Sequence, residues 1–289
     1  MITLDNEFLT VTINPKGAEL TGLFNKETQL EYMWGGDPAV WGKHSPVLFP
    51  IVGTLKNNSY TYNGHSYSLS RHGFAREKNF AVDEHKSDEA VFVLVSDEES
   101  RGVFPFDFRL RLKYSLLANT LSVTYEVLNS DDQDLYFSIG AHPAFKLPLV
   151  PGTSYEDYFL EFEQQETAGR WPINKEGLIE NSSLPVLNND TVLPLSRELF
   201  SKDALVFKSL KSSMVSLRSD KTPHGLEFEF SGFPFLGLWA APGGDFVCIE
   251  PWCGIADSVD TDQILEHKEG INKLLPKEKF VRTWSVKVM

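Results

Sequence analysis

Hydrophobic and polar residues alternate along most of the chain, which is the pattern of β-strands with one buried face. Residues 8–14, 108–116 and 121–127 alternate strictly, so each presents one apolar side to a core. Residues 90–95 are continuously apolar, which indicates a strand buried on both faces. Further apolar runs, which we also expect to be strands, occupy residues 159–162, 205–207, 214–217, 226–230, 235–240, 246–249 and 280–288.

Turn-forming residues separate these runs. Asn63 and Gly64 stand between two short alternating segments, and an Asn-Gly pair in that position is the strongest short-range hairpin signal. Ala118 and Asn119 separate two of the long alternating runs in the same way. We therefore expect neighbouring strands to be joined by short turns rather than by helices.

Helical signals are few. Residues 96–101 are acidic and follow a possible cap at Ser96, so we expect either a solvated loop or one helical turn. The polar stretches 174–189 and 251–275 could hold turns or short helices. Many short strands without alternating helices predict an all-β fold, a single large β-sandwich domain over residues 1–289.

Length and composition agree with that interpretation. A chain of 289 residues is long enough for two average domains, but large all-β folds reach this size as one, and no linker divides this chain. Hydrophobic residues make up 42% and charged residues 23%, which excludes disordered, collagen-like and coiled-coil proteins.

The charge balance restricts the partners. Acidic residues outnumber basic ones 40 to 27, and a net charge of −13 repels nucleic acids and anionic lipids, so we expect neither partner. Two cysteines make no disulfide framework. The first seven residues lack signal-peptide features, and no apolar run approaches the roughly 20 residues of a membrane span, so we expect a cytoplasmic protein.

Three segments could carry chemistry. The first combines Arg71, His72, Gly73 and Arg76 just after a predicted strand. His72 is either a functional imidazole or a loop residue that donates to a backbone carbonyl.

In the second segment, His142 follows an apolar run. Gly140 permits a bulge or a close approach, and Pro143 biases His142 toward an extended conformation. His142 serves either packing or function.

The third segment places Glu250 at the end of an apolar strand, between Cys248 and Cys253. Burial there would raise the pKa of the carboxyl toward that of a useful base, whereas a carboxyl that reaches solvent would have no such role. The cysteines lack a second pair, so we expect no metal site and treat both as small buried hydrophobes. Two histidines and a carboxylate, without a nucleophile motif or a phosphate loop, suit acid–base chemistry.

In chain order and rough spacing, these segments resemble the aldose 1-epimerase (galactose mutarotase) superfamily. The resemblance covers nearly the whole chain, and the loop 71–76 looks most like the LacX-type branch, with similarity to hexose-6-phosphate 1-epimerases as well. The motifs that carry it occupy residues 46–50, 72–74, 104–106, 140–145 and 248–251.

The resemblance implies a galactose mutarotase-like β-supersandwich that interconverts the α and β anomers of an aldose without a cofactor. It implies that Glu250 is the general base, that His142 is the general acid and that His72 assists at the anomeric centre. The expected partner is a small-molecule sugar, and the assembly is either a monomer or a homodimer.

The chain departs from galactose mutarotases where they carry Gly-Arg-x-x-Asn-Arg, because residues 53–58 read Gly-Thr-Leu-Lys-Asn-Asn. Lys56 and Arg71 are the candidates to replace the missing arginine. Asp203 corresponds either to the aspartate that contacts sugar hydroxyls or to a solvated loop residue. Arg76 resembles a phosphate-binding arginine of the hexose-6-phosphate branch; the alternative is a salt-bridged loop arginine.

Two alternatives to a mutarotase for free sugars stay open. One is a hexose-6-phosphate 1-epimerase, which the local arginines favour and the net charge disfavours. The other is a non-catalytic carbohydrate-binding protein. Sugar hydroxyls can be bound without an acid and a base, so the presence of both histidines and the carboxylate counts against that reading.

Overall fold

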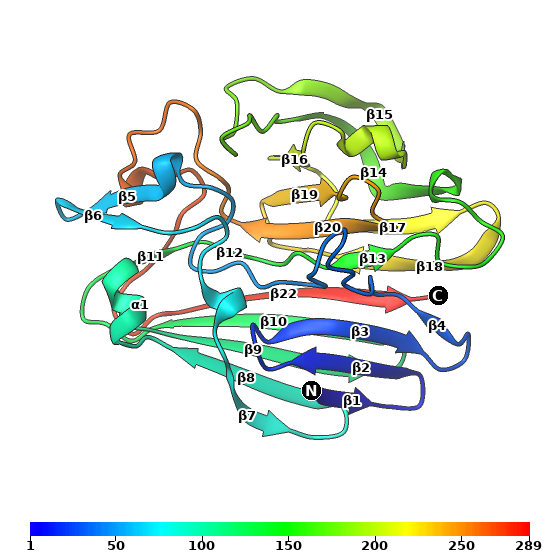
Figure 1. Cartoon of the computed structure of the whole chain (residues 1–289), viewed down its shortest axis with the longest axis horizontal. Helices are drawn as coiled ribbons and strands as arrows, with labels where there is room; N and C mark the ends of the chain where they lie inside the picture. The colour runs from blue at the N-terminus through cyan, green and yellow to red at the C-terminus, as the bar shows by residue number, and fades with distance from the viewer.

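The computed structural model describes residues 1–289 and is built mainly from antiparallel strands (Figure 1). The largest sheet has nine strands. In spatial order they are β15 (Leu184–Pro194), β14 (Tyr158–Arg170), β17 (Met214–Ser219), β18 (Thr222–Glu229), β22 (Lys279–Val288), β10 (Thr120–Asn129), β9 (Phe108–Leu117), β8 (Glu89–Val95) and β7 (Ala81–His85).

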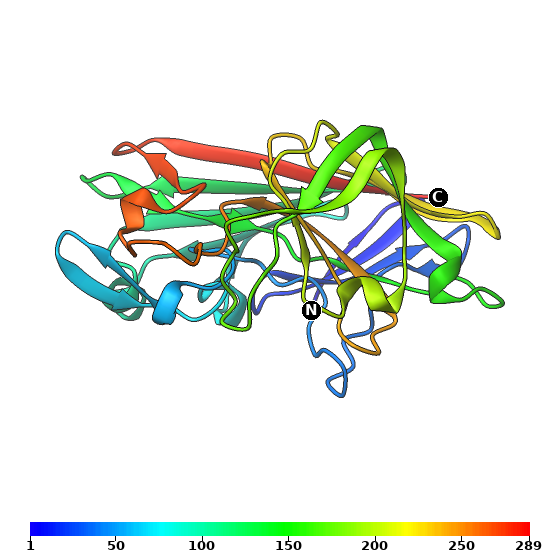
Figure 2. The same ribbon diagram turned by 90° about the horizontal axis from the view of Figure 1, so that it is seen from above.

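Two smaller sheets cover one face of this sheet, as the view from above shows (Figure 2). One sheet consists of β1 (Ile2–Asp5), β2 (Leu9–Asn14), β3 (Glu19–Asn25) and β4 (Leu30–Glu31). The other consists of β12 (Ile139–Gly140), β20 (Phe246–Cys253), β19 (Phe235–Trp239) and β16 (Leu205–Phe207), with β13 (Ala144–Lys146) also paired to β20. Two further pairs join β5 (Ser59–Tyr62) to β6 (His65–Ser68) and β11 (Leu135–Phe137) to β21 (Asn272–Leu274).

The core lies between the large sheet and the two smaller ones. One cluster of 71 buried hydrophobic side chains extends from Leu4 to Val288. Every second residue of β10 is buried, because successive side chains of a strand point to opposite faces. The Phe145 ring of β13 lies 5.9 Å from Phe228 of β18, so the site-bearing sheet packs directly on the large one. The predicted all-β sandwich is confirmed.

The hairpin and the buried strand predicted from the sequence are also confirmed. Tyr62 pairs with His65 around Asn63 and Gly64, both of which have positive φ. Five of the seven residues of β8 are buried.

Helices are short, and none is long and apolar enough to cross a membrane. They are α1 (Glu98–Val103) and the 3₁₀ turns η1 (Lys56–Asn58), η2 (Ala75–Glu77), η3 (Tyr155–Asp157), η4 (Arg197–Phe200) and η5 (Leu265–His267).

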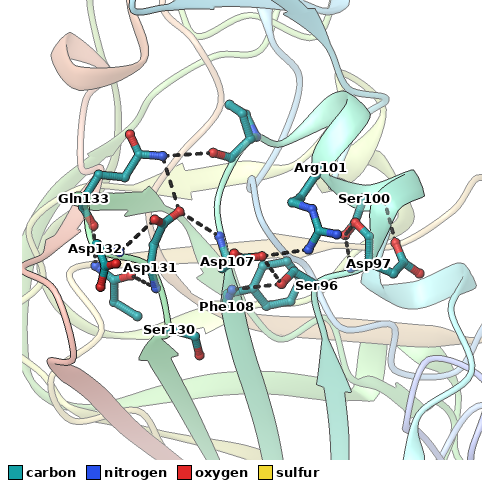
Figure 3. A network of polar contacts seen from close by, with 12 residues as sticks. Ser96, Asp97, Ser100, Arg101, Asp107, Phe108, Ser130, Asp131, Asp132 and Gln133 are labelled. Carbon is teal, nitrogen blue, oxygen red and sulfur yellow. Dashed lines mark hydrogen bonds and ion pairs between the residues drawn. The ribbon is translucent and has the colours of Figure 1, made fainter.

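The cap of α1 differs from the prediction. Asp97, not Ser96, is the N-cap, and its Oδ1 accepts the N–H of Ser100 at 2.6 Å. Ser96 instead donates its hydroxyl to Asp107 at the start of β9, at 2.8 Å. Figure 3 shows the resulting network, which ties α1 to β9 and to the turn after β10. The carboxylate of Asp97 suits the N-cap position because it is a strong acceptor for the unpaired N–H groups of the first turn.

Two further expectations need correction. Residues 174–189, where turns or short helices could lie, hold a turn at residues 175–177, but β15 begins at Leu184 and takes the end of the stretch. β15 is an edge strand that is mostly exposed, so it carries no apolar alternation to reveal it. Glu250 lies inside β20 rather than at its end, because the strand continues to Cys253.

Candidate active site

A cleft of about 260 Å³ opens above the sheet formed by β19 and β20. This volume is below the usual range for drug-sized ligands, so it suits a small molecule. It brings together six of the seven residues proposed from the sequence. Its lining consists of Trp41, Gly53, Arg71, His72, Arg76, His142, Ile173, Gly177, Ile179, Asp203, Ala204, Val206, Trp239, Glu250, Trp252 and Ala256.

An interruption in the sheet creates the place for the central residues. β12 and β13 both pair with β20, but the chain between them leaves the ladder opposite residues 249–251. Pro251 can therefore occupy an inner strand, because its missing N–H falls in this interruption. The Pro251 carbonyl still accepts the N–H of Ala141 at 3.1 Å. His142 lies in the interruption, beside Glu250.

His142 and Glu250 form a buried pair. His142 Nε2 lies 3.3 Å from Glu250 Oε2, and the two residues are 8% and 2% exposed. Gly140 permits a close approach of a different kind, to Trp252: a Cβ at Gly140 would lie 2.6 Å from the Trp252 ring. His142 Nδ1 has no hydrogen-bonding partner within the protein.

His72 enters the cleft from a strained loop. Its φ is +68°, a left-handed conformation that is uncommon for residues other than glycine. Gly73 follows with φ +70°, and a Cβ there would lie 2.3 Å from the Phe49 carbonyl oxygen. Backbone hydrogen bonds hold the loop: the His72 N–H donates to Gly53 O at 2.9 Å, and the Phe74 N–H donates to Phe49 O at 3.0 Å. Gly73 is therefore a requirement of this turn, and the backbone bonds hold His72 in its left-handed conformation.

The contacts of His72 determine its tautomer. The buried Gly53 N–H donates to Nδ1 at 3.0 Å, and Arg71 Nε lies 3.3 Å from Nε2. A neutral imidazole has one acceptor nitrogen, so both contacts cannot be hydrogen bonds at once. The Gly53 contact is the shorter one and satisfies a buried backbone donor, so we place the ring proton on Nε2. With this tautomer His72 is a neutral lining residue of the cleft whose Nε2–H lies beside Arg71 Nε.

Burial dominates the electrostatics of all three groups. It lowers the pKa of His72 well below the ordinary histidine value, and the charges of His142, Arg71 and Arg76 lower it further. It lowers the pKa of His142 to about 3, with the two arginines acting in the same direction. It raises the pKa of Glu250 well above the ordinary carboxyl value, an effect that the nearby Arg71 opposes.

The two arginines and Asp203 lie at the rim of the cleft. Arg71 Nη2 lies 3.7 Å from Asp203 Oδ1, and both side chains are partly exposed. Arg76 Nη2 donates to the Arg71 carbonyl at 2.9 Å. Asp203 has φ +72°, and its Oδ1 accepts the N–H of Ala204 at 2.7 Å. The arrangement offers two cations and one carboxylate to a ligand.

The structure places Lys56, one of the two candidates for the missing arginine, outside the cleft. Its Nζ donates to the Val259 carbonyl at 2.7 Å, and its backbone N–H donates to Asp257 Oδ2 at 2.9 Å. Because the Lys56 side chain is engaged with the Val259 carbonyl and Arg71 lines the cleft, Arg71 is the better candidate to replace the missing arginine.

Unpaired polar atoms gather at this cleft. Buried side-chain polar atoms with no hydrogen-bonding partner within the protein include Arg76 Nε and His142 Nδ1, and both residues line the cleft. Buried polar groups in folded proteins are normally paired, so this concentration indicates a place where a polar ligand binds.

Sequence reasoning missed the aromatic residues of the cleft. Trp41 stacks on the His142 ring at 5.0 Å between centroids, and Trp239 meets the same ring edge-on at 5.6 Å. Trp41 lies in a loop without periodicity. The available signal was a large aromatic residue in a Gly- and Pro-rich loop, because loops carry many binding residues.

One cluster of possible metal ligands lies at the cleft. Donor atoms of His142, Cys248 and Glu250 are within 4.8 Å of one another, and all three residues are buried. Burial raises the pKa of the Cys248 thiol well above its ordinary value, so the thiolate that a metal requires is disfavoured. Cys248 fits its predicted place as a small buried hydrophobe in β20.

Comparisons with known proteins identify the family and the fold. The family model described as aldose 1-epimerase matches residues 1–259. The plasmid-encoded protein LacX of Lactococcus lactis subsp. lactis is 35% identical over 299 aligned residues, covering 100% of this chain and 99% of LacX.

Two crystal structures are similar over their whole length. A galactose mutarotase related enzyme from Lactobacillus acidophilus has a TM-score of 0.94 and 39% identity, with 99% of this chain and 96% of that chain covered. A galactose mutarotase-like protein from Lactobacillus casei ATCC 334 has a TM-score of 0.94 and 29% identity, with 100% of both chains covered.

Proposed function

The chain belongs to the aldose 1-epimerase family, and from that premise we propose that it interconverts the α and β anomers of an aldose by acid–base ring opening and closure. One observation carries the proposal above all. A buried imidazole and a buried carboxyl form a pair at 3.3 Å and face a cleft of about 260 Å³.

In the proposed reaction Glu250 accepts the proton of the C1 hydroxyl. His142, protonated, donates a proton to the ring oxygen as the bond between that oxygen and C1 breaks. The product is the open-chain aldehyde with a free hydroxyl at the former ring oxygen. Rotation about the C1–C2 bond presents the other face of the carbonyl, and the two proton transfers in reverse close the ring as the other anomer.

His72 supports the same centre without changing its own protonation. Its ring lies 5.8 Å from the ring of His142, and its Nε2–H is a fixed donor. A donor of this kind stabilises oxygen atoms that gain negative charge as protons move. In this proposal Arg71 and Asp203 at the rim hold sugar hydroxyls.

The pair works with one proton in total. Burial alone favours the uncharged arrangement, with the proton on Glu250. The reactive arrangement has the proton on His142, and it carries two opposite charges 3.3 Å apart. Moving the proton between the partners leaves the net charge of the pair unchanged, so the transfer avoids burying a net charge.

We expect a broad, bell-shaped dependence of kcat on pH. At low pH the pair binds a second proton, becomes cationic, and Glu250 can no longer accept a proton from the sugar. Burial lowers the pKa at which this second proton binds, so the acid limb lies below the ordinary pKa of histidine. At high pH the pair loses its single proton and becomes anionic. Burial raises the pKa of this deprotonation, so the alkaline limb lies well above the ordinary carboxyl pKa.

Arg71→Gln tests the sign of this effect. Arg71 lowers the pKa of both partners, so its removal is expected to move both limbs of the kcat profile to higher pH. Anomer exchange measured at saturating sugar from pH 4 to 10 checks this. The matched control is Arg218→Gln on β17, whose profile should equal that of the wild type. Limbs that move to lower pH would contradict the charge assignment.

Arg76→Ala distinguishes a free sugar from a phosphorylated one. Arg76 has a buried, unpaired Nε at the cleft, which could form a charge-assisted hydrogen bond to a phosphate. If the substrate is a hexose phosphate, KM should rise by about tenfold or more, since such a bond is worth about 1.5–3 kcal/mol. On free hexoses the change should be small. Equal small effects on both substrates would remove Arg76 from the binding site.

The decisive assay follows anomer exchange by polarimetry or NMR over a panel of free and phosphorylated aldoses. The enzyme reading requires acceleration of at least one sugar, lost in Glu250→Gln. Binding of a sugar without acceleration of its anomer exchange would instead support a non-catalytic carbohydrate-binding protein.

A further inference from the structure

We propose that Trp41 is a positioning residue for His142, and that its indole face favours the protonated form of that imidazole. The inference rests on the proposed function, because it explains how the buried acid comes to hold a proton. It concerns a residue that no sequence motif singled out.

The stacking geometry is that of a cation–π contact. The ring centroids of Trp41 and His142 are 5.0 Å apart, and the planes are inclined by 26°. Tryptophan has the best aromatic face for a cation within about 6 Å, and the attraction grows when the pair is desolvated. A protonated imidazole is such a cation, and His142 is only 8% exposed, so the pair is desolvated.

Two further aromatic rings hold Trp41 in this place. Phe246 of β20 stacks with the indole at 5.4 Å and 28°. The indole of Trp239 meets both Trp41 and His142 edge-on, at 5.6 Å in each case. The Trp41 ring therefore cannot move away from His142 without disturbing β19 and β20.

The loop that carries Trp41 is anchored beside His142. Trp34 Nε1 donates to the Trp41 carbonyl at 2.9 Å, and this bond links the start of the loop to the residue that carries the indole. The two ends of the loop bond to one residue of β13: the Trp34 N–H donates to Ala144 O, and the Ala144 N–H donates to His44 O, both at 2.9 Å. Ala144 is two residues from His142, so the loop and the acid share one support.

The charges around His142 leave a specific role for Trp41. From β20, the carboxyl of Glu250 favours the imidazolium, and the protonated thiol of Cys248 is uncharged. From the facing loop, Arg71 and Arg76 oppose it, and His72 is neutral. Trp41 is the group that can favour the imidazolium without adding a charge that would also move the pKa of Glu250.

The test compares Trp41→Leu with Trp41→Phe. Leucine keeps apolar bulk but removes the aromatic face, whereas phenylalanine keeps a face. The ¹⁵N chemical shifts of the His142 ring, in histidine-labelled protein from pH 2.5 to 8, report the imidazolium fraction across the lowered pKa of this group. In Trp41→Leu that fraction should fall by about two- to thirtyfold, the range of cation–π strengths, and the acid limb of kcat should move to lower pH. Trp41→Phe should lie between this variant and the wild type.

The controls separate this proposal from the proposed function. The NMR measurement needs no turnover, so it stands even if the chain catalyses nothing. Val40→Ala, an exposed neighbour in the same loop, should leave the His142 shifts unchanged. The proposal is overturned if His142 in folded Trp41→Leu has the same imidazolium fraction as in the wild type at each pH. A rise in KM with unchanged His142 shifts would have the same meaning, because the indole would then only contact the sugar.

Discussion

Replacing Glu250 by glutamine is expected to abolish most of the catalysed anomer exchange while the protein still folds and binds sugar. Glutamine keeps the shape of the side chain but cannot accept a proton, and loss of a general base typically costs about 10²–10⁴-fold in rate. Stability should change little, because burial already favours the neutral carboxyl, which an amide resembles. Polarimetry at saturating sugar measures the loss.

The partner of Glu250 provides a second arm to this experiment. His142→Asn should lose activity to a similar extent, and the double variant should be little worse than either single variant, because one coupled exchange needs both groups. Glu161→Gln, a surface carboxyl of β14 that pairs with Arg218, is the matched control and should exchange anomers at the wild-type rate. Wild-type exchange in Glu250→Gln, or fully additive losses, would refute the shared proton.

Replacing Lys268 by methionine is expected to be the most destabilising single change outside the core. Lys268 Nζ lies 2.6 Å from Asp257 Oδ1, and both side chains are 3% exposed. Removing one partner of a buried ion pair typically costs about 3–5 kcal/mol, because the other charge stays buried without compensation. Urea unfolding at neutral pH measures the change.

This ion pair also supports a wall of the cleft. Asp257 Oδ2 accepts the N–H of Lys56, and the Asp257 N–H donates to Thr54 O at 2.9 Å. The Ile179 N–H donates to Asp257 O at 2.8 Å. The backbone and the carboxylate of Asp257 therefore both hold the loop that carries Gly53, the residue that donates to His72.

Two comparisons make the stability prediction specific. The double variant Asp257→Asn/Lys268→Met should recover much of the lost stability, because it removes the uncompensated charge. Lys287→Met breaks an exposed pair with Glu227 and should cost at most about 1 kcal/mol. A Lys268→Met protein within 1 kcal/mol of the wild type would show that Asp257 is compensated in another way.

The sequence alone determined the class of fold and most of the strands. Alternation in β9 and β10 and the apolar run of β8 reflect which faces are buried, and burial is the constraint that strand sequences record most directly. Edge strands such as β7 and β15 escaped detection because they are largely exposed and record no such constraint. The family resemblance likewise named His72, His142 and Glu250 before any geometry was known.

What the tertiary structure decided depends on contacts between distant segments. Local sequence could not show that Gly53 sets the tautomer of His72, that Lys56 points away from the cleft, or that Trp41 stacks on His142. Each of these contacts joins residues from separate loops, whose course is set by the sheets that they connect. Hydrogen bonds and ring contacts act over a few ångströms, so the partners of a side chain are settled when the chain folds.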